Sequence, residues 1–192
     1  MSLTPNRPSR SRSRLRSRPA GLVAVAALAL GLTACGDDDT AAAADEAPVI
    51  EVRAVDFAFE DLPDRVPVGT TLTLVNDAPT ELHELVAVRL DDDEDRSADE
   101  LVSLPPPEMG ATLFAEDPAM VLLAAPGAEQ VAAVGDGTLT EAGRYLILCI
   151  IPTGVDPDVY FAAAAETEEG PPQVDGGPPH IAHGMYTELI VE

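Results

Sequence analysis

The hydrophobic residues of this chain fall in short runs rich in Val, Ile and Leu, and glycine or proline separates each run from the next. From residue 49 onward these runs cover 49–59, 70–75, 82–90, 120–125, 145–151 and 186–191. Short apolar runs that end at turn residues are typical of β-strands joined by tight connections. The pattern therefore predicts an all-β domain, an antiparallel sandwich or barrel.

Two of these runs are apolar on both faces. In the run 145–151, alternate residues share a face, and neither face carries a charge after Arg144. The run that begins near His83 has the same character. We therefore expect both strands to be central and buried, with Cys149 near the end of one and His83 at the start of the other.

One short helix is expected between the strands. Ser97 and Glu100 have the spacing of a capping box, residues 101–104 continue the helix, and the prolines at 105–107 end it. The acidic run 91–95 before it is expected to be a solvated loop. Residues 150–179 are rich in Pro, Gly and acid, so we expect a long loop before the C-terminal strand.

The N-terminal segment predicts export. Residues 1–19 are rich in Arg and Ser, and the apolar run 20–32 has 13 residues. A membrane span needs roughly 20 apolar residues, so this run suits a signal peptide better. It ends in Leu32-Thr33-Ala34-Cys35, which resembles the bacterial lipobox, whose Cys is lipidated and becomes the first mature residue. The alternative is a soluble secreted protein in which Cys35 has no such role.

These features predict three parts: a lipoprotein signal peptide at 1–34, an acidic, Ala-rich tether at 35–48, and a folded domain at 49–192. Lipidation of Cys35 would hold the domain at the cell membrane, outside the cytoplasm. We expect the domain to be a monomer.

The charge of the chain excludes several partners. It carries 34 Asp and Glu against 11 Lys and Arg, and six of the arginines lie before residue 19. After Ala34 there remain 34 acids and 5 arginines, a formal charge of −29. Nucleic acids and anionic lipid surfaces both require a basic patch, so the folded domain should bind neither. A redox partner with a basic docking face is expected instead, although a uniformly acidic proteome would produce the same charge.

The reactive side chains are few: two Cys, three His and no Trp. This set is too small for a multi-metal enzyme, a Ser-His-Asp catalytic set or a disulfide framework, so we do not expect an enzyme. Taken alone, His83, Cys149 and Met185 are each ordinary core residues. Taken together with His180, they supply two imidazoles, one thiolate and one weak axial thioether, which are the ligands of a type 1 copper site.

From about residue 49 to 191 the chain resembles the cupredoxins, the superfamily of plastocyanin and azurin. The resemblance is carried by Phe57-Ala58-Phe59, residues 66–70, Asn76 before His83, residues 139–145, Cys149 and residues 180–185. It implies a Greek-key sandwich with one type 1 copper held by His83, Cys149, His180 and Met185. It also implies a one-electron carrier. The alternatives are a protein for copper delivery or buffering, and a copper-free binding or structural module.

Three departures from plastocyanin-like proteins have consequences. Thirty residues separate Cys149 from His180 where only a few are usual. Glu84 and Ile150 stand where small plastocyanins often have Asn and Ser or Thr, so we expect the hydrogen-bonded link between the two ligand loops to be absent. His183 is an additional imidazole; we favour His180, because a single residue between His183 and Met185 is too short for the usual ligand loop.

Overall fold

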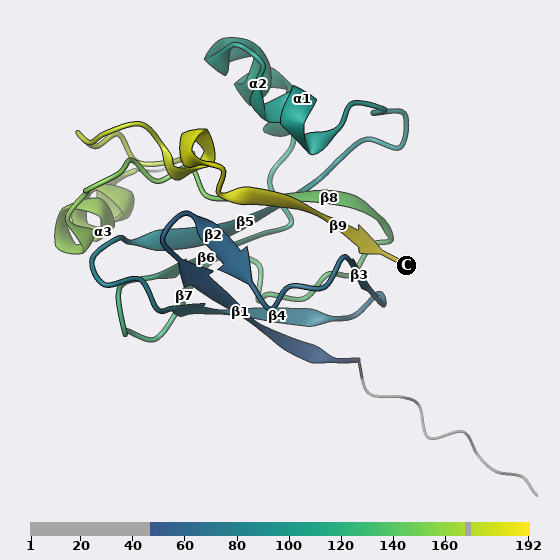
Figure 1. Ribbon diagram of the computed structural model, residues 1–192, viewed down its shortest axis with the longest axis horizontal. Coiled ribbons are helices and arrows are strands. Elements are labelled where there is room, and N and C mark those ends of the chain that lie inside the picture. The colour runs from purple at the N-terminus through teal and green to yellow at the C-terminus, as the bar shows by residue number, and fades with distance from the viewer. Residues whose placement is uncertain (1–46, 168–169) are drawn as a thin grey trace, which may run out of the picture. The chain divides into compact units, whose positions relative to one another are not determined.

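Nine strands form two sheets in the part of the chain that the computed structural model describes, residues 47–167 and 170–192. The predicted signal peptide, Cys35 and nearly all of the predicted tether lie outside these residues. The smaller sheet has the order β2-β1-β4, and the larger has the order β3-β9-β8-β5-β6-β7 (Figure 1).

The strands of the smaller sheet are β1 (Val49–Val55), β2 (Ala58–Glu60) and β4 (Thr71–Asn76). Those of the larger sheet are β3 (Arg65–Val66), β5 (His83–Arg89), β6 (Met120–Ala124), β7 (Val131–Val134), β8 (Gly143–Leu148) and β9 (Tyr186–Val191).

Most neighbouring strands run antiparallel, as expected, but β1 pairs with β4 and β3 with β9 in parallel. The parallel pairs arise because the chain leaves the smaller sheet after β2, forms β3 in the larger sheet and then returns beside β1.

The main core lies between the two sheets. Alternate residues of β4 are buried, as expected for a strand with one face toward the core. They pack with inward-facing residues of the larger sheet, and this cluster includes Leu72, Leu74, Leu85, Ile147 and Leu189. The predicted all-β sandwich is confirmed.

The centre of the larger sheet is buried on both faces. Every residue of β5 except Arg89 is buried, and the last four residues of β8 are buried as well. On the outer face, Val86, Val88 and Leu146 pack against Leu101 and Leu113 of two helices. This double burial confirms that the strands next to His83 and Cys149 are central.

The helices differ in number from the expectation. Helix α1 (Ala98–Val102) begins with the predicted capping box between Ser97 and Glu100. The prolines that follow also begin a second helix, α2 (Pro106–Leu113), because proline suits a first turn, whose N–H groups have no partner inside the helix. The expected loop 150–179 contains α3 (Pro157–Glu166), and a 3₁₀ turn, η1 (His180–His183), precedes β9. None of the helices in the described part of the chain combines the length and apolar character of a membrane span.

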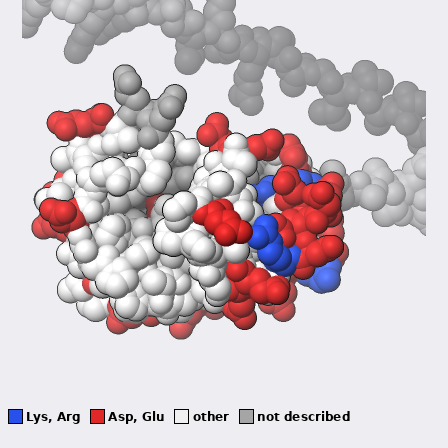
Figure 2. All heavy atoms as spheres, turned by 90° about the horizontal axis from the view of Figure 1, so that it is seen from above, with Lys and Arg blue, Asp and Glu red and all other residues white. Residues whose placement is uncertain are grey.

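The arginines of the folded domain are paired with acids. Each lies within ion-pair distance of at least one carboxylate; they are Arg53, Arg65, Arg89, Arg96 and Arg144. Figure 2 shows most of the charged side chains of this face gathered on its right side, next to a broad area without charges whose left and lower edges carry further acidic side chains.

Candidate metal centre

Two neighbouring strands bring His83 and Cys149 together. His83 is the first residue of β5, and Cys149 directly follows the last residue of β8. Since β5 and β8 are antiparallel neighbours, these two positions lie at the same end of the sheet. Turn η1 adds His180 at that end, because the Ile181 N–H donates to the Cys149 carbonyl at 2.8 Å.

The donor atoms of His83, Cys149 and His180 all lie within 4.8 Å of one another. His180 Nδ1 is 3.3 Å from Cys149 Sγ and 3.1 Å from His83 Nδ1. All three side chains are fully buried. Two nitrogens and one sulfur therefore converge on one point from three separate segments of the chain.

Met185 is also buried, and its backbone is hydrogen-bonded to both neighbouring segments. Its N–H donates to the His180 carbonyl at 3.2 Å, and its carbonyl accepts the Cys149 N–H at 3.1 Å. Gly184 allows the chain to turn sharply between η1 and Met185, because it adopts a left-handed backbone conformation with φ of 95°.

His183 lies away from the other donors. It is exposed, and its ring packs on Phe57 with 4.6 Å between ring centroids. The structure therefore brings His180 to Cys149 and His83, and leaves His183 at the surface.

We call residues 150–179, which connect Cys149 to His180, the excursion. Its two ends lie side by side and are hydrogen-bonded to each other. Pro152 and Pro179 form an isolated bridge, and the Thr153 N–H donates to the Pro178 carbonyl at 3.1 Å. Gly176 is required here, because a Cβ at this position would lie 2.5 Å from Pro152 Cβ. Thirty intervening residues are thus compatible with a ligand loop whose two ends lie side by side.

Comparisons with known proteins give structural neighbours only. No protein-family model and no curated protein sequence matches the chain. Among solved structures, Na-dithionite-reduced auracyanin from the photosynthetic bacterium Roseiflexus castenholzii is 21% identical, with a TM-score of 0.42; the alignment covers 75% of this chain and 96% of that chain. Auracyanin B is 19% identical, with a TM-score of 0.38, and 77% of this chain and 90% of that chain are covered. Both TM-scores are below 0.5, so the function proposed below rests on this chain's own strands and donor atoms.

The donor set fits a soft, redox-active metal. Two imidazoles and one thiolate suit copper in a trigonal site, and a buried methionine beside them suits a weak axial ligand. The same donors also bind zinc. Among the described residues the cluster consists of these two imidazoles and one thiol, a donor set that does not suit a hard, oxygen-binding cation such as Mg²⁺ or Ca²⁺.

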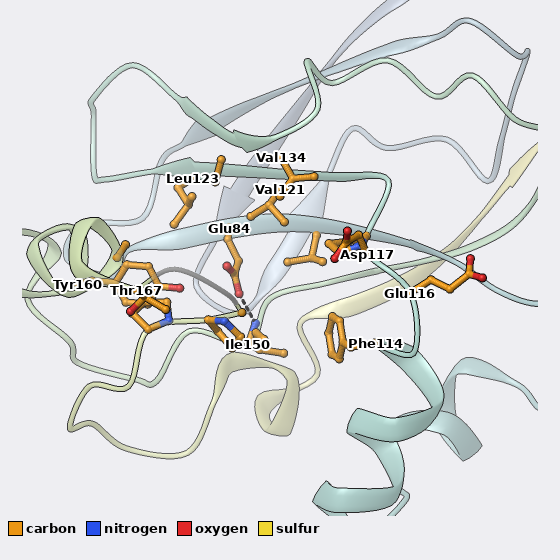
Figure 3. A pocket seen from close by; sticks show the side chains of 17 residues that line it. Glu84, Phe114, Glu116, Asp117, Val121, Leu123, Val134, Ile150, Tyr160 and Thr167 are labelled. Atoms are coloured by element: carbon orange, nitrogen blue, oxygen red, sulfur yellow. Dashed lines mark hydrogen bonds between the residues drawn. The ribbon is translucent and has the colours of Figure 1, made fainter.

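Glu84 links the two ligand segments, contrary to the expectation from sequence. Its Oε1 accepts the Ile150 N–H at 2.9 Å (Figure 3). The backbone N–H of Glu84 donates to Cys149 Sγ at 3.5 Å. The expectation was wrong because it considered Asn and Ser or Thr only, whereas a glutamate can reach the backbone of the neighbouring strand. Burial raises the pKa of the Glu84 carboxyl to about 7. With Tyr160, it lines one side of a cavity of about 550 Å³.

Two further polar residues hold the segment that leads to His83. Asn76 donates from Nδ2 to the carbonyls of Glu81 and Ala124, at 2.8 and 2.7 Å. Glu81 places its carboxylate against His180, with 3.2 Å between Oε2 and Nε2. Asn76 is singled out by the sequence analysis, but Glu81 is not. The only feature of the sequence that points to Glu81 is its position two residues before His83.

Burial sets the protonation of the metal-free site. It lowers the pKa of His83 to about 4, with a further contribution from His180, and it lowers the pKa of His180 as well. Burial also raises the pKa of the Cys149 thiol well above its usual value. At neutral pH both imidazoles are therefore uncharged and the thiol keeps its proton.

Metal uptake by the reduced protein will therefore release one proton, from Cys149. Between about pH 7.5 and 9 the apparent affinity for Cu(II) should rise about tenfold per pH unit, because higher pH favours loss of the thiol proton while the imidazoles are already neutral. Competition with a chelator of known proton affinity measures this slope. An apparent affinity that is independent of pH across this range would contradict a Cys149 ligand.

Proposed function

We propose that this chain is a type 1 copper protein of the cupredoxin kind that carries single electrons. The observation that supports it is the cluster of His83, Cys149 and His180, fully buried and with donor atoms within 4.8 Å of one another, at one end of a β-sandwich. Met185 is proposed as the weak axial ligand.

The copper would supply a one-electron couple, and the chain supplies a rigid site for it. His83 and Cys149 are held by adjacent strands that are buried on both faces, and Glu84 ties the Cys149 segment to β5. Ligands fixed in this way change little between oxidation states, which favours fast electron transfer. Burial of all three donors also excludes water from the thiolate and protects it from oxidation.

Addition of Cu(II) to the purified, reduced protein tests the proposal. We expect an intense visible absorption band and a reversible one-electron wave in voltammetry. Uptake of Cu(II) without that band would contradict a type 1 site, and binding of zinc in strong preference to copper would favour a structural metal.

Copper delivery or buffering would use the same ligands without redox turnover. The full burial of His83, Cys149 and His180 favours retention of the metal over rapid transfer, so we propose the electron carrier. Rapid loss of copper to a chelator would favour delivery. The Cys149 thiol lies 3.3 Å from His180 Nδ1, as a nucleophile and its base could, but both side chains are 0% exposed and no substrate can reach them, so we propose a carrier rather than an enzyme.

We also propose that the protein is lipid-anchored at Cys35 on the outer face of the cell membrane. Support comes from the basic segment, the apolar run and Leu32-Thr33-Ala34-Cys35. Cys35→Ala should move the protein from the detergent-extracted membrane fraction to the soluble fraction, or leave an unprocessed precursor. Cys149→Ala is the matched control and should remain with membranes. If Cys35→Ala fractionates like the wild type, the anchor is wrong.

The redox partner is proposed to present a basic docking face. The chain has a formal charge of −23, and the face in Figure 2 carries acids beside an uncharged area. Such a partner would associate more slowly as salt rises, because exposed charges are screened over about 8–10 Å at physiological ionic strength.

A further inference from the structure

The outer nitrogen of His180 faces a carboxylate rather than solvent. His180 Nε2 lies 3.2 Å from Glu81 Oε2, on the side of the ring opposite Cys149 and His83. The His180 side chain is 0% exposed and that of Glu81 is 16% exposed. Phe57 packs edge-on against the same imidazole, with 5.0 Å between ring centroids.

Glu81 is itself held from two directions. The Gly154 N–H donates to its Oε2 at 2.9 Å, and Asn76 Nδ2 donates to its backbone carbonyl at 2.8 Å. Gly154 belongs to the excursion between Cys149 and His180, whereas Asn76 ends β4. The carboxylate therefore joins the base of the excursion to the segment that leads into His83.

We propose that Glu81 is a positioning residue for His180, an inference that rests on the copper site proposed above. A carboxylate accepts hydrogen bonds and cannot donate them, so the pair at 3.2 Å requires the proton on His180 Nε2. The lone pair of Nδ1 then points toward Cys149 and His83, as a metal ligand needs.

The negative charge of Glu81 has a second consequence. A carboxylate hydrogen-bonded to a ligating imidazole makes that imidazole a stronger donor, and it stabilises the more highly charged metal ion. Glu81 therefore favours Cu(II) over Cu(I) and lowers the reduction potential of the site. Through Gly154, the excursion takes part in setting that potential.

Three variants of the full-length protein test this assignment. Glu81→Gln removes the charge but keeps an acceptor oxygen, and Glu81→Ala removes both. Asp56→Asn is the control, because it removes one exposed carboxylate next to Phe57 without touching a ligand. We expect Glu81→Gln to shift the ratio of Cu(I) to Cu(II) affinity about tenfold toward Cu(I), a rise in potential of about 59 mV for one electron. The control should shift it much less.

Nitrogen NMR of the His180 ring in the metal-free protein supplies an independent readout. The wild type and Glu81→Gln should show the proton on Nε2, whereas Glu81→Ala should show a mixture of the two tautomers. A wild-type ring protonated on Nδ1 would overturn the assignment, and so would a potential shift in Glu81→Gln no larger than that of Asp56→Asn. The NMR result requires no copper, so it decides the role of Glu81 even if the copper proposal fails.

Discussion

Replacing Cys149 with alanine will abolish the intense visible absorption of the copper-loaded protein. That band is a thiolate-to-copper charge transfer, and Cys149 Sγ is the sulfur that lies 3.3 Å from His180 Nδ1. The two imidazoles that remain can bind Cu(II) only weakly and without that transition. Titration of the reduced variant with Cu(II), followed in the visible range, measures the loss.

The fold should survive this change, so the loss of colour can be assigned to the ligand. Cys149 is a small buried side chain, and its truncation removes a single sulfur atom from the core. We expect a cost of about 1 kcal/mol in the free energy of unfolding, well below that of truncating a buried leucine. Cys35→Ala, which removes the other cysteine, should keep the band. A band of unchanged intensity in Cys149→Ala would refute the type 1 site.

The sandwich and the ligand cluster could be predicted because local patterns determine them. The apolar run at 70–75, separated from its neighbours by glycine and proline, predicts a strand, and apolar residues on both faces predict the central position of β8. The ligands His83, Cys149 and His180 could be predicted because the chain has few histidines and cysteines, and because the spacing from His180 to Met185 resembles that of cupredoxin ligand loops.

The excursion was harder to predict, since its order depends on contacts between distant residues. Thr153 and Pro178 are 25 positions apart, and their hydrogen bonds close its base. Composition rich in Pro, Gly and acid obscured α3, although Asp156 followed by Pro157 is a recognisable helix start. The roles of Glu81 and Glu84 likewise depend on tertiary placement, because each binds a backbone N–H more than 60 residues away along the chain.

His180→Ala and His183→Ala will have very different effects on copper binding. His180 is fully buried within reach of Cys149 and His83, whereas His183 is exposed and packs on Phe57. Loss of a residue that only supports a ligand typically costs 10–100-fold in metal affinity, so loss of the ligand itself should cost at least about 100-fold. We expect a change of less than about twofold for His183→Ala, because its ring makes surface contacts only. Competition for Cu(II) against a chelator measures both.

A third variant shows whether the lost affinity reflects a missing ligand or a damaged loop. His180→Gly leaves a hole of the size of an imidazole beside Cys149, and added imidazole can enter it and bind the metal through its free nitrogen. We expect millimolar imidazole to restore the visible band in His180→Gly and to have no effect on the wild type, whose site is already complete. If His183→Ala loses the band and His180→Ala keeps it, the two histidines exchange roles. That exchange would require η1 to rotate, since the Met185 N–H and the His180 carbonyl are now hydrogen-bonded at 3.2 Å and hold His180 toward Cys149.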